Sequence, residues 1–270
     1  MPELPEVEST RIALENIVIN NIITMTKVLN YSLKIPIPSN IDTILVNKKI
    51  ISINRIAKYL LINLNNGYSL ISHLGMSGSW RVREKTKKHD HFLLKLDSNL
   101  LLAYNDPRRF GIITTVCTKN VKEHSLLKNI GYDPFDLALS PSILYQLTQQ
   151  AKSSIKTFLM DGTKINGIGN IYASEILFMA KIHPTKQANY ILPTEAENML
   201  IAIKKILKQA INNGGTSIQS YISPNEKRGT FQSKLKVYNR ANKNCYICNM
   251  QIKQIKQNNR STFYCENCQQ

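Results

Sequence analysis

The chain has 270 residues, of which 43% are apolar and 20% charged, a composition typical of a folded globular protein rather than a disordered one. This length allows two modest domains, or one domain with an appendage, and no apolar run approaches the roughly 18 residues that a membrane span needs. The formal net charge of +17 favours a polyanionic partner such as nucleic acid, although a general codon bias toward lysine would produce the same excess.

The N-terminus has neither the basic patch nor the apolar stretch of a secretory signal. We therefore expect the protein to act in the reducing cytoplasm, where its five cysteines do not form disulfides. Nothing in the sequence suggests an assembly larger than a monomer.

The chain begins MPELPEVE, with helical apolar spacing predicted over residues 6–18. Removal of Met1 would leave Pro2 as a secondary amine, and an α-amino group titrates near ~8, so part of it is unprotonated at neutral pH. Such an amine attacks an aldehyde carbon to form an iminium ion, and Glu3 is placed to donate a proton beside it. The plain alternative is a proline-kinked terminus with no chemistry.

A mostly antiparallel β domain is predicted up to about residue 125. Alternating residues flank Asn66-Gly67, a strong hairpin signal, and residues 91–106 and 111–118 continue the pattern. Cys117 lies on an apolar strand and is expected in the core. Lys58 immediately precedes the strand YLLINL. Its amine either reaches water from the end of the strand, or serves as an acid, a base or a phosphate ligand.

Two glycine-containing turns in this region carry unusual residues. HLGMSGSW holds Met76, and NDPRRFG holds Arg108 and Phe110. Packing in the core is the common use of Met and Phe. On turns flanked by arginines, however, they are also suited to wedging into a base stack and filling the space of a displaced base.

Helical periods follow at 141–150, 153–160, 170–180 and 194–212. In NGIGNIYASEILF a glycine turn leads into a helix whose first amides can bind phosphate, with Asn170 as the cap or a ligand. Glycine turns before helices are common, so this signal alone is weak.

Four cysteines close the chain in two pairs, Cys245-x2-Cys248 and Cys265-x2-Cys268. Two such pairs supply the four sulfur ligands of tetrahedral Zn²⁺ with no open position, so we expect one structural zinc ion. A redox role is typical of one isolated pair rather than two in series. Arg260, five residues before Cys265, is suited to phosphate contact or is one more solvated basic residue.

Seven stretches together resemble the bacterial formamidopyrimidine-DNA glycosylase family: PELPEVE, AKYLL, HLGMSGS, KHDHF, DPRRFG, GIGNIYASEILF and RSTFYCENCQ. The resemblance implies an α+β multidomain protein with an N-terminal β-sandwich and flanking helices (2–125), a helix-two-turn-helix domain (131–222) and a zinc ribbon (236–270). It also implies a base-excision-repair glycosylase and abasic-site lyase that removes 8-oxoguanine and formamidopyrimidines from damaged double-stranded DNA.

The resemblance also implies roles for individual residues. Pro2 would be the Schiff-base nucleophile, Glu3 the general acid, Lys58 the proton donor in β-elimination, and Arg260 a participant in δ-elimination. Six residues would contact DNA: Met76, Arg108 and Phe110 in the gap left by the flipped nucleotide, and His89, Lys152 and Asn170 elsewhere. The loop 216–231 would close over the lesion.

Some residues depart from the family pattern. Asn239 and Asn249 stand where glycine is common, and asparagine also tolerates positive φ, so we expect the turns to survive. The loop 216–231 differs most, which leaves lesion preference open. One alternative is the endonuclease-eight group, which excises oxidised pyrimidines and usually begins PEGPE, where this chain has Leu4. Another is a zinc-ribbon DNA-binding protein without catalysis, against which Pro2, Glu3 and Lys58 argue.

Overall fold

The computed structural model describes residues 1–216 and 229–270, and these divide into two compact units. One unit comprises residues 1–129 and 213–232, and the other comprises 130–212 and 233–270. Among the described residues, no helix is both long and apolar enough to cross a bilayer. Because the placement of the units relative to each other is not determined, each is described by itself.

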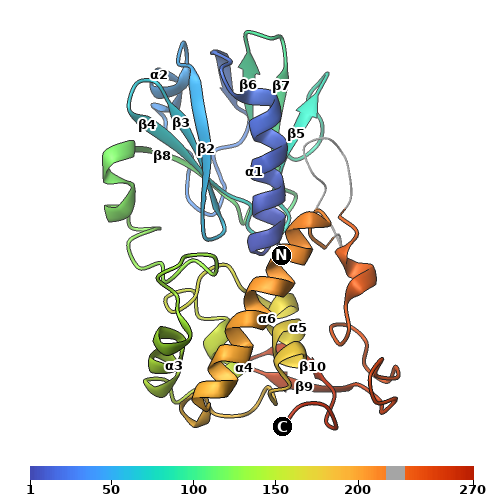
Figure 1. The fold of residues 1–270 in the computed structure, drawn as a ribbon. Helices are drawn as coiled ribbons and strands as arrows, with labels where there is room; N and C mark the ends of the chain where they lie inside the picture. Colours follow the sequence, from blue (N-terminus) through green and yellow to red (C-terminus); the bar gives the residue numbers. More distant parts are fainter. Residues whose placement is uncertain (217–228) are drawn as a thin grey trace. The chain divides into compact units, whose positions relative to one another are not determined.

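The first unit is a β-sandwich of two four-stranded antiparallel sheets (Figure 1). One sheet has the order β1-β6-β7-β5 and the other β2-β3-β4-β8. The strands are β1 (Ile23–Val28), β2 (Ile50–Ile56), β3 (Tyr59–Leu64), β4 (Tyr68–His73), β5 (Ser79–Arg83), β6 (Asp90–Leu96), β7 (Leu101–Asn105) and β8 (Ile112–Cys117). The predicted antiparallel β domain is confirmed, and a 3₁₀ turn, η1 (Thr118–Glu123), follows its last strand.

The predicted hairpin at Asn66-Gly67 joins β3 and β4, with Asn63 opposite Ser69. Only Gly67 has positive φ, at +78°, so one glycine suffices to turn the chain. Between the sheets, Trp80 is fully buried and packs edge-on against Phe92 and Tyr104. These rings form the centre of the apolar core, where aromatic side chains contribute the largest buried areas.

Two helices complete the first unit: α1 (Leu4–Val18) and α2 (Ile41–Leu45). Helix α1 packs on β2 and β3 through one face that includes Val7, Leu14 and Val18. It starts two residues before the predicted position, because Pro5 fits the first helical turn, where no amide partner is needed.

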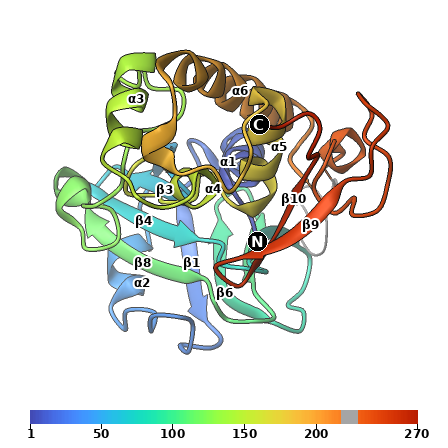
Figure 2. The same ribbon diagram turned by 90° about the horizontal axis from the view of Figure 1, so that it is seen from below.

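The second unit contains the predicted helices and the cysteine ribbon, as Figure 2 shows. Its elements are α3 (Pro141–Gln149), α4 (Ile155–Leu159), α5 (Asn170–Ala180), η2 (Ala188–Tyr190), α6 (Pro193–Asn212), η3 (Phe231–Lys234, which spans the boundary between the units), β9 (Lys253–Gln257) and β10 (Arg260–Tyr264). Helix α6 packs on both α3 and α5. It does so through buried residues at helical spacing, including Met199, Ile203 and Ala210.

Strands β9 and β10 form an antiparallel hairpin that packs on α5. Phe178 of α5 enters the apolar core of the ribbon beside Val237 and Phe263. Asn239 and Asn249 have φ of +58° and +65°, which confirms that asparagine supports these turns in place of glycine.

Candidate active site

The start of α1 holds the two residues expected to do chemistry. Pro2 is buried, and Glu3 is 2% exposed. The backbone N–H of Glu3 donates to Glu6 Oε2 at 2.8 Å, and the two glutamates form a reciprocal capping box at the helix N-terminus. Pro2 and Glu3 are therefore held by the first turn of a helix rather than by a loose chain end.

Glu6 also binds the segment that leads into residues 217–228. Its Oε1 accepts from the amide of Thr216 at 2.7 Å and from the Thr216 hydroxyl at 3.0 Å. Gly215 has φ +77°, and a Cβ there would lie 2.6 Å from Glu6 Oε1, so a larger residue does not fit. Thr216 pairs with Thr230 in a β-bridge. The base of the expected lesion loop is thus tied to the helix that begins with Glu3, while residues 217–228 lie outside the described part of the chain.

Asp106 organises the turn that carries Arg108 and Phe110. It is fully buried, and its carboxylate accepts from the Ser77 hydroxyl and from the Gly111 amide, the latter at 2.8 Å. Because Ser77 belongs to the neighbouring turn 74–78, one buried carboxylate fixes both turns. A carboxylate that accepts several hydrogen bonds at such a position stabilises a turn strongly.

The two turns approach each other closely at Gly75. A Cβ on Gly75 would lie 2.5 Å from the carbonyl carbon of Phe110, so glycine is required there. Met76 and Phe110 are both exposed, and the Arg108 guanidinium lies 5.0 Å from the centre of the Phe110 ring. The structure therefore brings Met76, Arg108 and Phe110 onto adjoining turns of one unit, where apolar side chains are left open to solvent.

Lys58 lies in the turn between β2 and β3, next to Ala57, whose φ is +54°. Its charge acts on His73, at the end of β4. Desolvation, followed by the charges of Lys58 and Lys34, lowers the pKa of His73 to about 4. The Gly75 amide donates to His73 Nδ1 at 3.0 Å, which leaves the proton of the neutral ring on Nε2. This neighbourhood of two lysines and an N–H donor is suited to an anion.

We expect His73 to stay neutral down to about pH 5. Because the folded pKa of His73 lies below the ordinary histidine value of 6.5, the unfolded chain binds more protons, and this residue destabilises the fold as pH falls from 6.5 toward 4. Ring ¹⁵N chemical shifts recorded between pH 8 and 4 measure the titration directly. Replacing Lys58 with Met should raise the midpoint, and a wild-type midpoint above 6 would contradict the environment described.

In the second unit, Asn170 opens α5 but does not cap it, which corrects one alternative from the sequence. Gly169 occupies the N-cap position. The Asn170 side chain instead donates to the carbonyl oxygen of Ser261 at 3.0 Å and accepts from Lys156 Nζ at 2.6 Å. The start of α5 is in this way joined to the β9–β10 hairpin. Arg260, the first residue of β10, is exposed.

Lys156 is the buried centre of this junction, and the sequence interpretation missed it. It is 2% exposed, and its Nζ donates to Asn170, to the Ser261 carbonyl at 3.1 Å and to the Thr262 hydroxyl at 2.7 Å. Three acceptors satisfy the three protons of the ammonium, which is the condition for burying such a charge. The sequence signal that could have found Lys156 is its spacing from the apolar Leu159, three residues later on the same predicted helix. Leu159 is fully buried in the structure, and Lys156 lies on the same inner face of α4.

The four C-terminal cysteines converge as predicted. Their sulfur atoms all lie within 4.8 Å of one another, with Cys248 Sγ 3.4 Å from Cys265 Sγ and Cys245 Sγ 3.9 Å from Cys268 Sγ. Tetrahedral Zn–S bonds of about 2.3 Å place sulfurs about 3.8 Å apart, so this set fits the ion. A hydrogen bond from the Met250 amide lowers the pKa of Cys248 to about 6, whereas burial and the neighbouring sulfurs raise that of Cys268. A bound Zn²⁺ would stabilise the four sulfurs as thiolates and offset the repulsion between their negative charges.

Cys117 differs from these four and from its prediction. It ends β8 and is partly exposed rather than a core residue, as are the three residues before it in the strand. It is outside the cysteine cluster and has no part in it.

Comparison with known proteins supports the family resemblance along the whole chain. Residues 1–113 match the family model described as the formamidopyrimidine-DNA glycosylase N-terminal domain, and residues 130–222 match that of its H2TH domain. The formamidopyrimidine-DNA glycosylase of Rickettsia africae is 41% identical over 272 residues, covering 100% of this chain and 99% of that protein. That of Hydrogenovibrio crunogenus is 42% identical, covering 100% and 96%. The chain belongs to the formamidopyrimidine-DNA glycosylase family.

Solved structures agree in fold. Lactococcus lactis Fpg, in a complex with DNA that contains Fapy-dG, has a TM-score of 0.92 and 33% identity over 100% of both chains. MutM (Fpg) of Thermus thermophilus has a TM-score of 0.91 and 30% identity over 99% of this chain and 98% of that one. As a member of this family, the protein is a DNA glycosylase of base excision repair that also carries abasic-site lyase activity.

The expected site residues fall in both units of this glycosylase. Pro2, Glu3, Lys58 and the three residues on the adjoining turns belong to the first unit. Asn170 and Arg260 belong to the second, where Asn170 donates to the carbonyl of Ser261, the residue after Arg260. His89 is exposed before β6, with φ +69°, and Lys152 is exposed before α4. Neither is brought into contact with another expected site residue by a described hydrogen bond.

Lys156 gives a prediction that separates positioning from DNA contact. Replacing it with Met keeps the length but removes the ammonium that holds Asn170, Ser261 and Thr262 together, so we expect affinity for abasic-site DNA to fall about tenfold, or ~1.4 kcal/mol. Because Lys156 is buried, the dependence of log affinity on log salt should not change. The matched variant Lys152→Met removes an exposed charge and should lower that slope by about one. Equal slope changes in the two variants would refute the positioning role.

Proposed function

We propose that the protein removes oxidised purines, 8-oxoguanine and formamidopyrimidines, from duplex DNA and then cleaves the strand at the abasic site. The observation that carries this proposal is the buried pair Pro2-Glu3 at the rigid start of α1. Support for the lesion class comes from relatives whose structures hold Fapy-dG or abasic-site DNA.

The chemistry proposed for Pro2 and Glu3 begins once Met1 has been removed. With Met1 attached, the Pro2 nitrogen is a tertiary amide and is not nucleophilic. As a free amine it attacks C1′ of the damaged nucleotide, while Glu3 donates a proton to the sugar ring oxygen or to the leaving base. The C1′–N bond to the base breaks and the Pro2 nitrogen loses its proton. The C1′–O4′ bond of the sugar ring then opens, with the proton going to O4′, and the Pro2 nitrogen becomes part of an iminium ion.

The iminium ion then serves as an electron sink for strand cleavage. Loss of a proton from C2′ delivers electrons toward the iminium carbon, and the C3′–O bond breaks with departure of the 3′ phosphate. A second elimination breaks the C5′–O bond. We propose Lys58 as the proton donor in the first elimination and Arg260 as a participant in the second. Both side chains are cationic and can offset the negative charge of the departing phosphates.

The remaining residues are proposed to hold the opened duplex. Met76, Arg108 and Phe110 project from adjoining turns and would fill the gap left by the extruded nucleotide, with Arg108 facing the orphaned base. Flipping costs a few kcal/mol of lost stacking, which an apolar wedge offsets in part. His89, Lys152 and Asn170 would contact the DNA.

The metal and the division of the chain into domains are also part of the proposed function. The four clustered sulfurs would hold one structural Zn²⁺ and no open coordination position would remain for catalysis. We propose three functional parts: a catalytic β-sandwich at 2–125, a helix-two-turn-helix domain at 131–222 and a zinc ribbon at 236–270. The protein would act as a monomer, in the cytoplasm and on the nucleoid.

Excision from defined duplexes tests the lesion class. We expect release of 8-oxoguanine opposite cytosine at least tenfold faster than release of thymine glycol, with no release from undamaged duplex. The wild-type chain freed of Met1 is the enzyme to use. Faster release of thymine glycol would assign the protein to oxidised pyrimidines instead, and release of neither would leave a DNA-binding protein without base-excision activity.

A further inference from the structure

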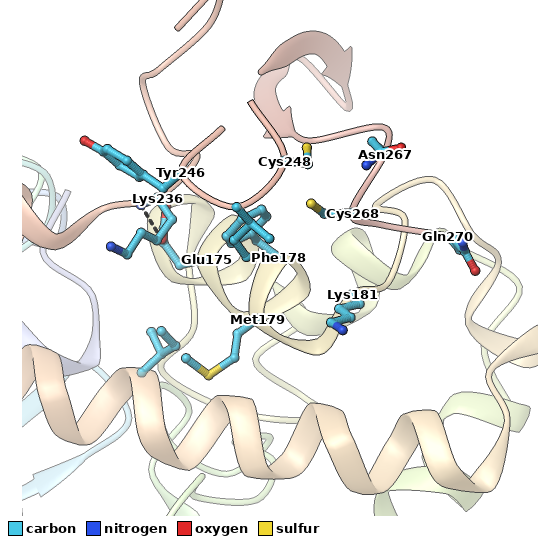
Figure 3. Close-up of a pocket in the computed structure, with 12 residues that line it drawn as sticks. Glu175, Phe178, Met179, Lys181, Lys236, Tyr246, Cys248, Asn267, Cys268 and Gln270 are labelled. Carbon is cyan, nitrogen blue, oxygen red and sulfur yellow. Dashed lines mark hydrogen bonds between the residues drawn. The ribbon is translucent and has the colours of Figure 1, made fainter. Parts of the chain in front are cut away.

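A cavity of about 720 Å³ lies in the second unit between the end of α5, α6 and the two cysteine turns (Figure 3). Cys248 and Cys268 of the proposed zinc cluster line one side of it, and the proposed DNA chemistry makes no use of the rest. Its volume is in the range of sites that accept a small ligand or the side chains of a bound peptide.

The cavity has an apolar floor and an apolar edge. Phe178 and Met179 line it from α5, and Ile206 lines it from α6. On the first cysteine turn, Tyr246 and Ile247 are 64% and 69% exposed, although both are large apolar side chains. Adjoining apolar side chains that remain exposed beside a cavity are typical of a surface that a partner covers.

The surroundings of the cavity carry positive charge. Lys181 and Lys236 line it, and the Arg240 guanidinium stacks 3.5 Å from the centre of the Tyr246 ring, with Lys236 Nζ at 4.8 Å. The Arg240 guanidinium also donates to the carbonyl oxygens of Lys236 and Asn244, so its positive charge is held in place beside the cavity.

Glu175 is the only acidic side chain among the described residues that line the cavity. Its carboxylate is 2% exposed and accepts from the amides of Lys236, Val237 and Tyr238 at 2.8 to 2.9 Å. Burial also raises the pKa of Glu175. The oxygens of the Glu175 carboxylate are therefore taken by backbone amides, and Lys181 and Lys236 are the cationic side chains that an incoming group meets.

The cavity is separate from the expected DNA contact of this unit. Asn170, joined to the β9–β10 hairpin, is at the first residue of α5, and Met179 is nine residues further along. At 1.5 Å per residue, that separates them by about 14 Å along the helix. A ligand in the cavity can leave the hairpin and Asn170 accessible.

We propose that this cavity docks an acidic peptide segment of a partner protein, which inserts an apolar side chain between α5 and the first cysteine turn while its carboxylates meet Lys181 and Lys236. An apolar cavity with a basic rim complements such a segment in both shape and charge. Duplex DNA matches only the charge, since its sugar-phosphate backbone offers no apolar side chain to fill the floor. The inference is independent of the lesion class.

The test uses the full-length, zinc-loaded chain and a fluorescein-labelled peptide of four Asp residues followed by Leu-Phe with a free carboxylate. We expect saturable binding with a Kd on the order of 10–100 µM, as for a short motif with one anchor. Ile247→Asp and Lys236→Glu should each weaken binding at least fivefold. The matched control Lys205→Glu makes the same charge change at an exposed site on α6 that does not line the cavity, and should change it less than twofold.

Two further readouts locate the peptide. The methyl resonance of Met179 should shift on titration while that of Met76, in the other unit, should not. Saturating abasic-site duplex should leave the peptide Kd unchanged within twofold. The proposal is overturned by no saturable binding below 1 mM, by equal weakening in Lys205→Glu, which would mean general charge attraction, or by displacement of the peptide by duplex, which would make the cavity part of the DNA surface.

Discussion

Replacing Glu3 with Gln is expected to slow excision of 8-oxoguanine by about 10²–10⁴-fold, the usual contribution of a general acid. Glutamine has the same length and still accepts a hydrogen bond at the start of α1, but it has no proton to donate to the sugar or the base. Cleavage of a preformed abasic site should be much less affected, because no base then has to leave. Single-turnover rates on the two substrates measure the difference.

Glu8 supplies the matched control for this prediction. It lies on the same helix and pairs with Arg11 and Arg55 at 2.8 Å, away from the capping box of Glu3 and Glu6. Glu8→Gln removes one carboxylate charge from α1 in the same way and should change excision less than twofold. Equal losses in the two variants, or an equal loss of both activities in Glu3→Gln, would show that Glu3 acts on folding rather than on base departure.

Removing the metal from the four-cysteine cluster is expected to unfold the ribbon and to lower DNA affinity by at least 100-fold. The ribbon has a small apolar core of its own, and zinc binding of ~10–16 kcal/mol is what folds such segments. Cys268→Ala should have the same effect. Elemental analysis, which should give one zinc per chain, and DNA titration measure the two quantities.

Two features of the chain make the metal experiment specific. Trp80 is the single tryptophan and is fully buried in the first unit, so its fluorescence should stay constant while the ribbon unfolds. Cys117 is outside the cluster, so Cys117→Ala should retain one zinc and full DNA affinity. A wild-type chain without zinc, or a metal-free chain that binds DNA normally, would contradict the structural role.

Local patterns in the sequence predicted most of the secondary structure. The predicted helix at 194–212 is α6 at Pro193–Asn212, and Asn66-Gly67 forms the predicted hairpin, because both features depend on residues close together in the chain. The cysteine spacing likewise predicted a cluster, since each pair is fixed by its own turn and only the meeting of the pairs depends on the fold.

Features that depend on distant partners were missed. Lys156 binds the Ser261 carbonyl, 105 residues away, and Glu6 binds Thr216, 210 residues away. Asn170 was expected as a cap or a ligand because it stands at the start of a helix. The cap was wrong, since Gly169 is the N-cap and the Asn170 side chain bonds to Lys156 and Ser261. The neutral state of His73 also depends on burial and on two lysines brought near it by the fold. No local pattern encodes these contacts.

Borohydride trapping followed by peptide mapping tests the central claim that Pro2 is the nucleophile. Sodium borohydride reduces an iminium ion between protein and DNA to a stable amine, and mass spectrometry then identifies the modified residue. The account predicts one cross-link, on Pro2, in a preparation whose intact mass shows that Met1 is absent, and none in chains that retain Met1. A cross-link on a lysine such as Lys58, or trapping by chains that still carry Met1, would contradict it.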